Sequence, residues 1–209
     1  MFKVLILAFD GVEALDFAGP FEVFTTATRM HQRLHPDARP LLWVASVADV
    51  AHAGQDVAAR AGLRLLPDHT LARSPQADVL IVPGGVVDAP IASDATLAWI
   101  ARQAGAARIT ASVCTGAFLL AAAGVVGDGD TVTTHWEDVA DLRRQFPALR
   151  VQQGPRWIDN GRVVTSAGIS AGIDMSLHLV ERLAGRALAE RTALQMDFEW
   201  TQNETEASA

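Results

Sequence analysis

Short runs of apolar residues alternate along the chain with longer stretches that have a helical pattern. Most runs are continuous rather than interrupted by polar residues, as expected for strands covered on both faces of a sheet. Strands are predicted at 4–9, 41–47, 79–82 and 109–113, with weaker candidates at 131–134 and 162–165, and helices at 13–30, 94–105, 115–123, 136–146 and 173–185. This alternation predicts an α/β fold, flavodoxin-like, with a mostly parallel central sheet and helices on both faces.

Two segments depart from simple alternation. Asn160-Gly161 stands between two apolar runs, which is a specific signal for a β-hairpin. Residues 57–64 have an extended pattern that leads into a turn at Pro67-Asp68. No repeat or linker interrupts the chain, so residues 1–200 are expected to form a single domain, followed by a polar and frayed C-terminal tail at 201–209.

Composition narrows the classes of function. The 209 residues carry a formal net charge of −7, and no Lys/Arg cluster is present, which argues against nucleic acid as a partner. A single cysteine excludes an intramolecular disulfide and fits a reducing compartment. The N-terminus leads directly into a predicted strand without a signal-peptide pattern, and no apolar run is long enough to span a membrane. A cytoplasmic protein without a membrane partner is expected.

That single cysteine, Cys114, lies at the turn from a predicted central strand into a predicted helix. The small residues Ser112 and Gly116 flank it at the spacing that a sharp nucleophile elbow requires. A helix N-terminus directs N–H groups at the sulfur, which favours the thiolate and predicts a pKa below that of a free cysteine. The alternative is a buried structural cysteine without reactivity.

Loops that follow parallel strands are the usual place for a site, and one of them contains Pro83-Gly84-Gly85. Its unshielded backbone N–H groups, together with the amide of Thr115, could form an oxyanion hole or an anion nest. The alternative is a plain tight turn.

Two side chains could assist Cys114. Asp16 lies between Leu15 and Phe17, where a carboxylate is costly unless it has a partner. If Asp16 faces the sulfur, the two groups would share one proton and Asp16 could donate it to a substrate; otherwise it caps a helix. His135 follows a weak strand and could pair with the thiol or be structural.

Nothing in the sequence indicates a bound cofactor. No pair of histidines has metal-ligand spacing, and one cysteine cannot build a thiolate zinc site. No Gly-rich phosphate loop opens a helix after the first strand. These residues therefore give no reason to expect a bound metal or cofactor.

Four segments together resemble the DJ-1/PfpI superfamily, whose fold is related to the class I glutamine amidotransferases. They are residues 79–85, 112–116, 133–136 and 165–174, so the resemblance extends over nearly the whole chain. It implies a homodimer. An exposed Trp43 or Trp157 would help to locate the interface, because an exposed apolar patch often marks one.

Within the superfamily, many members have Glu where this chain has Asp16. Asp16, Thr115 and the segment 133–136 together resemble the isocyanide hydratases and the amidase-like domain of AraC-type transcriptional regulators. Those regulators continue into a DNA-binding region, whereas this sequence ends soon after Trp200, so direct DNA contact is not expected.

The resemblance to isocyanide hydratases implies roles for the candidate residues. Cys114 would attack the isocyanide carbon of a small-molecule substrate, Asp16 would handle the proton and orient water, and Thr115 would supply hydroxyl or amide contacts. Gly84 and Gly85 would line the pocket, and Ile169 would pack near the sulfur.

Other functions remain open. Glyoxalase-like or deglycase-like chemistry occurs in the superfamily, but it resembles a Cys–Glu–His site, and Asp16 makes it less favoured. A redox or stress sensor, in which Cys114 oxidises reversibly, needs the same accessible thiol. A protease is least favoured, because a small pocket at a buried elbow leaves little room for a polypeptide.

Overall fold

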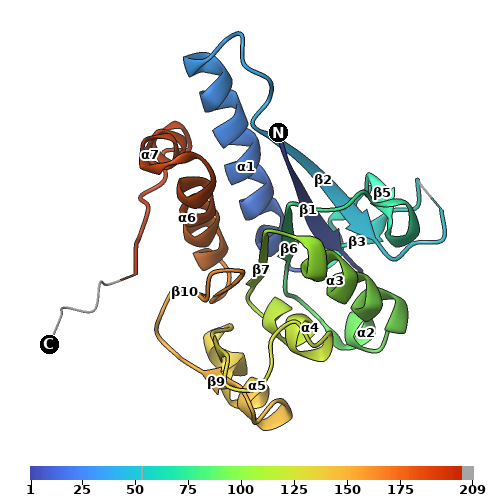
Figure 1. Cartoon of the computed structure of the whole chain (residues 1–209). Helices are drawn as coiled ribbons and strands as arrows, with labels where there is room; N and C mark the ends of the chain where they lie inside the picture. Colours follow the sequence, from blue (N-terminus) through green and yellow to red (C-terminus); the bar gives the residue numbers. More distant parts are fainter. Residues whose placement is uncertain (53, 204–209) are drawn as a thin grey trace, which may run out of the picture.

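The computed structural model describes residues 1–52 and 54–203, and within them a seven-stranded sheet forms the centre of the fold (Figure 1). The strand order is β10-β11-β7-β6-β1-β2-β5, and every neighbouring pair is parallel except β10 with β11. The strands of this sheet are β1 (Phe2–Ala8), β2 (Leu42–Ala48), β5 (His69–Thr70), β6 (Val79–Val82), β7 (Ile109–Val113), β10 (Trp157–Asp159) and β11 (Val163–Ser166). The predicted α/β fold is confirmed.

Helices cover both faces of this sheet (Figure 1). One group packs together on one face: α1 (Ala14–Leu34), α6 (Ala171–Ala184) and α7 (Arg186–Gln195). The other group consists of α2 (Asp88–Ile91), α3 (Asp94–Ala106) and α4 (Gly116–Ala122). The central strands between them, β1, β6 and β7, are therefore almost completely buried, which explains their continuous apolar runs.

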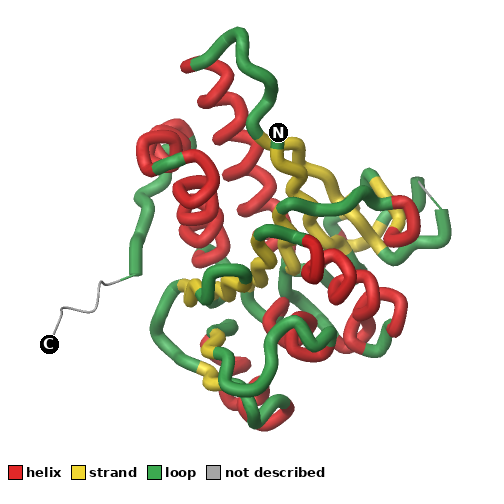
Figure 2. Tube along the Cα trace, in the orientation of Figure 1, coloured by secondary structure: helices red, strands yellow, loops and turns green. Residues whose placement is uncertain are grey.

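A smaller unit lies beside the main sheet, connected by long loops (Figure 2). It contains the parallel pair β8 (Thr131–Val132) and β9 (Arg150–Val151), with α5 (Val139–Gln145) between them in the sequence. Short 3₁₀ turns occur at Arg60–Gly62, Leu71–Arg73 and Trp136–Asp138. The turn Trp136–Asp138 and α5 together occupy the helix predicted at 136–146.

The predicted hairpin at Asn160-Gly161 is confirmed, because β10 and β11 pair antiparallel around it and Gly161 has a φ of +83°. The extended segment at 57–64 is itself a small hairpin, in which β3 (Val57–Ala58) pairs with β4 (Arg64–Leu65). These local turns depend on residues adjacent in sequence, which is why the pattern revealed them.

The pattern missed two helices, the four-residue α2 and α7, and two very short strands. Gly185, with a φ of +92°, ends α6 as predicted, but the chain resumes helical geometry at once in α7. Half of the residues in helix α7 are polar, and its buried side chains include Leu188 and Thr192, one helical turn apart. Strands β5 and β9 contain two residues each, too few for a recognisable period.

The start of the predicted C-terminal tail is not frayed. Thr201 N donates to Asp174 Oδ1 at 2.8 Å, and the Asn203 side chain hydrogen-bonds the backbone of Trp157. The rest of the predicted tail, 204–209, lies outside the described residues.

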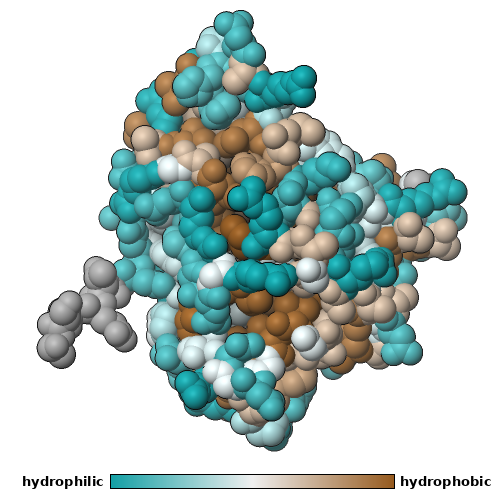
Figure 3. Space-filling view, in the orientation of Figure 1, coloured by the Kyte–Doolittle hydropathy of each residue, from teal (hydrophilic) through white to brown (hydrophobic). Residues whose placement is uncertain are grey.

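The surface is polar over much of the face seen in Figure 3, with apolar side chains gathered in separate groups. Neither tryptophan proposed as an interface marker is exposed: Trp157 is buried and Trp43 is half-buried, because both lie in strands of the sheet. The exposed tryptophan among the described residues is Trp136. Over the same residues, no helix combines the length and the hydropathy that a membrane span requires.

Candidate active site

Cys114 occupies a strained turn between β7 and α4. Its φ of +55° is in the left-handed region, which residues other than glycine rarely adopt. The turn is held by hydrogen bonds from Cys114 N to Ser166 O (3.2 Å) and from Thr134 Oγ1 to Cys114 O (2.9 Å). A Cβ atom at Gly116 would overlap the carbonyl oxygen of Val82, so only glycine fits there. The predicted sharp elbow between strand and helix is confirmed.

Pairing between two loops brings Asp16 to this elbow. Glu13 N donates to Gly84 O, and Val86 N donates to Gly11 O, both at 2.9 Å, so the loop after β1 lies against the loop after β6. Asp16 is the third residue of α1, and its Oδ2 accepts a hydrogen bond from Gly84 N at 3.2 Å. The N-cap residue of α1 is Glu13. The alternative in which Asp16 caps this helix is therefore wrong.

The carboxyl of Asp16 is fully buried, and burial raises its pKa to about 7. The nearby charge of Glu13 adds to the increase, while the Gly84 N–H and the Cys114 thiol oppose it. Its Oδ1 has no hydrogen-bond partner of normal geometry among the described residues. Such an oxygen beside a thiol is where a shared proton is expected.

The same surroundings act on Cys114, which is 7% exposed. Burial and the charge of Asp16 raise the pKa of its thiol, and the Thr115 N–H that favours the thiolate does not offset them. The predicted low pKa is therefore wrong, since that argument considered only the helix N-terminus. Because the pKa of the thiol is raised well above that of the carboxyl, the thiol keeps its proton at neutral pH while Asp16 gains and loses one.

The glycines after β6 are used within the protein. Gly84 N donates to Asp16, and Gly85 N donates to Thr115 Oγ1 at 2.8 Å, while the same hydroxyl donates to Gly85 O at 3.0 Å. The expected oxyanion hole is wrong for these two amides, because neither N–H is free for a substrate. A Cβ at Gly84 would lie 2.5 Å from Thr115 N and 3.0 Å from Asp16 Oδ2, so this loop needs glycine to approach both.

His135 lies near Cys114 but does not pair with it. Its Nδ1 is 3.3 Å from Asp138 Oδ2, and no hydrogen bond joins its ring to Cys114 within the described residues. Gly168 lies between them: a Cβ there would be 2.9 Å from Cys114 Sγ and would overlap the His135 ring. The hypothesis of a Cys–His pair is therefore wrong, and His135 is a wall of the site.

A cavity of about 450 Å³ opens onto the sulfur. Of the predicted site residues, it is lined by Cys114, Thr115, Gly85, His135 and Ile169, whereas Gly84 and Asp16 lie behind this lining. The sequence interpretation missed an apolar wall and a group of carboxylates in the lining: Val87, Ile91, Phe118, Glu13, Asp88, Glu137, Asp138 and Asp141. The available signal was the pair of acidic residues, Glu137 and Asp138, two and three positions after His135.

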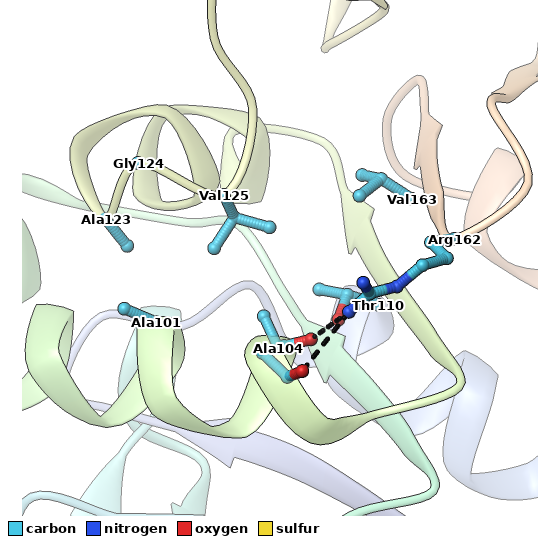
Figure 4. A pocket seen from close by; sticks show the side chains of 9 residues that line it. Ala101, Ala104, Thr110, Ala123, Gly124, Val125, Arg162 and Val163 are labelled. Carbon is cyan, nitrogen blue, oxygen red and sulfur yellow. Dashed lines mark hydrogen bonds between the residues drawn. The ribbon is translucent and has the colours of Figure 1, made fainter.

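A second cavity, of about 290 Å³, lies at the start of β7, at the other end of that strand from Cys114 (Figure 4). Arg162 Nη2 donates to the carbonyls of Ala104 (2.9 Å) and Gly105 (3.4 Å) and so caps the last turn of α3. The guanidinium of Arg162, the charged group in this cavity, therefore has a structural role. Across the described part of the chain, no three His, Cys, Asp or Glu side chains are grouped as metal ligands.

Burial of Asp16 leads to a stability prediction. Between its ordinary pKa of 3.8 and about 7, the folded protein holds a proton that the unfolded chain has lost, so the free energy of unfolding falls as pH rises through this window. Asp16→Asn is expected to raise the free energy of unfolding by roughly 2–4 kcal/mol near pH 8 and to change it little near pH 4.

Denaturant unfolding at both pH values measures this effect. Asp88→Asn is the matched control, because this substitution removes the same charge from an exposed residue that lines the same cavity. A variant at Asp16 that is less stable than the wild type near pH 8 contradicts the argument.

Comparisons with known proteins agree on a common fold. A family model described as the DJ-1/PfpI family matches residues 2–182. Isonitrile (isocyanide) hydratase of Pseudomonas putida is 36% identical over 198 residues, which cover 94% of this chain and 78% of that protein. A THiJ/PfpI family protein from Pseudomonas syringae superposes with a TM-score of 0.79 at 27% identity, over 100% of this chain and 79% of that chain.

A transcriptional regulator is also similar. The HTH-type regulator GbdR of Pseudomonas aeruginosa is 34% identical over 151 residues, which cover 72% of this chain and 41% of the regulator. The chain therefore spans less than half of the length of this relative, and the similarity carries no information about the rest of the regulator.

Proposed function

This chain belongs to the DJ-1/PfpI family, and on that premise we propose that it is a cysteine-dependent hydratase that converts small isocyanides into N-substituted formamides. The observation that carries the proposal is the fully buried Asp16 beside Cys114, at an elbow that opens into a cavity of about 450 Å³. The 36% identity to isonitrile hydratase supports the same chemistry.

The first step forms a bond between sulfur and carbon. Cys114 Sγ attacks the terminal carbon of the isocyanide while its thiol proton passes to the Asp16 carboxylate, and Asp16 then delivers a proton to that carbon. The product is a thioimidate, Cys–S–CH=N–R, in which no atom has been gained or lost. Asp16 suits this step because its pKa of about 7 allows it both to accept and to donate a proton near neutral pH.

The second step uses water. Asp16 removes a proton from a water molecule that adds to the thioimidate carbon; the S–C bond then breaks, the nitrogen gains a proton and the thiol is regenerated. The amide R–NH–CHO leaves. Gly84 holds Asp16 in place, Thr115 fixes the loop that carries Gly84 and Gly85, and Ile169 closes one side of the cavity over the intermediate.

Turnover of an aromatic isocyanide tests the proposal. In water enriched in ¹⁸O, the purified protein is expected to form an N-aryl formamide whose carbonyl oxygen carries the label, because the oxygen comes from solvent. Absorbance follows the rate and mass spectrometry follows the label. Absence of formamide above the uncatalysed background overturns the proposal, and an α-oxoaldehyde assayed in parallel tests glyoxalase-like chemistry.

A second function is supported by the similarity to GbdR. In this alternative the cavity binds a small molecule without converting it, and the described fold is a sensing domain. Mass spectrometry of the protein after incubation with an isocyanide separates the two. Recovery of unmodified ligand, with a bound complex and no formamide, favours sensing over catalysis.

A further inference from the structure

More carboxylates than basic side chains line the cavity above Cys114. The carboxylates among its lining residues are Glu13, Asp88, Glu137, Asp138 and Asp141, whereas the basic side chains in the lining are Arg60 and His135. Walls of low dielectric constant concentrate the electric field of these charges in the cleft. The resulting negative potential raises the local concentration of cationic ligands and lowers that of anionic ones.

Neighbouring cations offset only part of this charge. Arg60 lies 3.5 Å from Glu13, and Arg144, outside the lining, lies 2.6 Å from Asp141; these two arginine side chains are 65% and 69% exposed, so solvent weakens their effect. Even with His135 counted among the cations, the carboxylates outnumber them.

Two of the carboxylates are well placed to meet a ligand. Asp88 forms no ion pair with any described residue, and Glu137 has only His135 within ion-pair distance, at 3.9 Å. Val87, Ile91 and Phe118 form an apolar part of the same cavity. A ligand with an apolar body and a positively charged end matches both surfaces.

We propose that this cavity selects small electrophiles that carry an ammonium group and disfavours those that carry a carboxylate or sulfonate. This inference rests on the proposed function in one respect, namely that the reacting group of the ligand is an isocyanide. The charge selection itself belongs to the cavity and can be measured without turnover.

Because the chain has one cysteine, charged thiol reagents report the potential at Cys114 directly. Two methanethiosulfonates of similar size, one ending in ammonium and one in sulfonate, each form a disulfide with Cys114 and release methanesulfinate. The rate of each reagent with the protein is divided by the rate of the same reagent with an uncharged small thiol, so that differences in intrinsic reactivity cancel. At low ionic strength the normalised rate is expected to be about tenfold or more higher for the ammonium reagent, and salt is expected to reduce this ratio. A ratio near one, or a faster sulfonate, overturns the proposal.

Matched variants separate the cavity from the net charge of the protein. Asp88→Asn is expected to lower the ratio about twofold or more, whereas Asp37→Asn, an equal change of charge at an exposed residue outside the cavity lining, is expected to leave it unchanged. Equal effects of the two variants contradict a local origin.

Isocyanides with the same chain and either an ammonium or a carboxylate end complete the test. Turnover with a higher kcat/KM for the ammonium compound supports both proposals. Turnover without that preference overturns the charge selection alone. If no isocyanide reacts but the reagent ratio and its loss in Asp88→Asn are observed, the hydratase function fails and the charge selection stands.

Discussion

Replacing Cys114 with alanine is expected to abolish isocyanide turnover, with kcat reduced by roughly 10⁴-fold or more. The reason is that the proposed thioimidate cannot form without the sulfur, and the chain has no second cysteine to take its place. The fold is expected to survive, since alanine fits the space of the thiol and keeps the backbone geometry of the elbow. Formamide production by the wild type and the variant, at matched concentrations, measures the effect.

Two further variants test whether the sulfur acts together with Asp16. Cys114→Ser retains the size of the side chain but is a much weaker nucleophile, so it is expected to be almost as inactive as Cys114→Ala. Asp16→Asn removes the proton carrier while leaving an acceptor for Gly84 N–H, so kcat is expected to fall with the fold intact. Activity that persists in Cys114→Ala excludes covalent catalysis by this residue.

Gly116→Val is expected to destabilise the protein more than any other substitution considered in this article, by about 3 kcal/mol or more. A Cβ at this position would overlap Val82 O and lie 3.0 Å from the carbonyl atoms of Pro83. These are backbone atoms at the end of a buried strand, which cannot move aside as the tip of a flexible side chain can. Denaturant unfolding of the variant measures the loss.

Gly105→Ala provides the matched control, because a Cβ there meets no atom within 4 Å and the residue lies inside α3. Alanine is expected to leave stability unchanged or to increase it by about 0.5–1 kcal/mol, as the helix gains conformational preference. Cys114→Ala should also be more stable than Gly116→Val. Equal midpoints for the Gly116 and Gly105 variants are incompatible with the close packing of the elbow.

The buried carboxyl of Asp16 therefore has opposite effects on the stability and the proposed activity of the protein. Asp16 is expected to lower the free energy of unfolding as pH rises from 3.8 to about 7, and it is also expected to be required for turnover. A residue with both properties is difficult to explain by packing alone. The stability of Asp16→Asn and its activity should change in opposite directions.

Features that depend on neighbours in the chain could be predicted from the sequence. The elbow at Cys114 follows from small residues on both sides of the cysteine, and the hairpin follows from Asn160-Gly161. The buried strands were visible because their apolar runs are continuous. Helix α7 was missed because Gly185 is a normal helix terminator, and only the packing of Leu188 against the body of the protein favours a new helix directly after it.

Electrostatic features of the site could not be predicted in this way. The expected low pKa of Cys114 considered the helix that begins beside it, but burial and the Asp16 carboxyl, which comes from the first helix, act in the opposite direction. The amides of Gly84 and Gly85 were expected to face a substrate, but Asp16 and Thr115 use them. The pairing of His135 with Asp138 instead of Cys114 is a further case.

The sequence by itself determined the α/β fold, the position of the elbow and the identity of the two acids, Cys114 and Asp16. These depend on periodicity and on turn sterics within a few residues, which are properties of adjacent positions. The tertiary structure alone decided that the pKa values of both acids are raised, where the glycine amides are used, and that the cavity is lined by carboxylates. Those properties depend on which loops the strand order brings together, since burial and charge act through space and not along the chain.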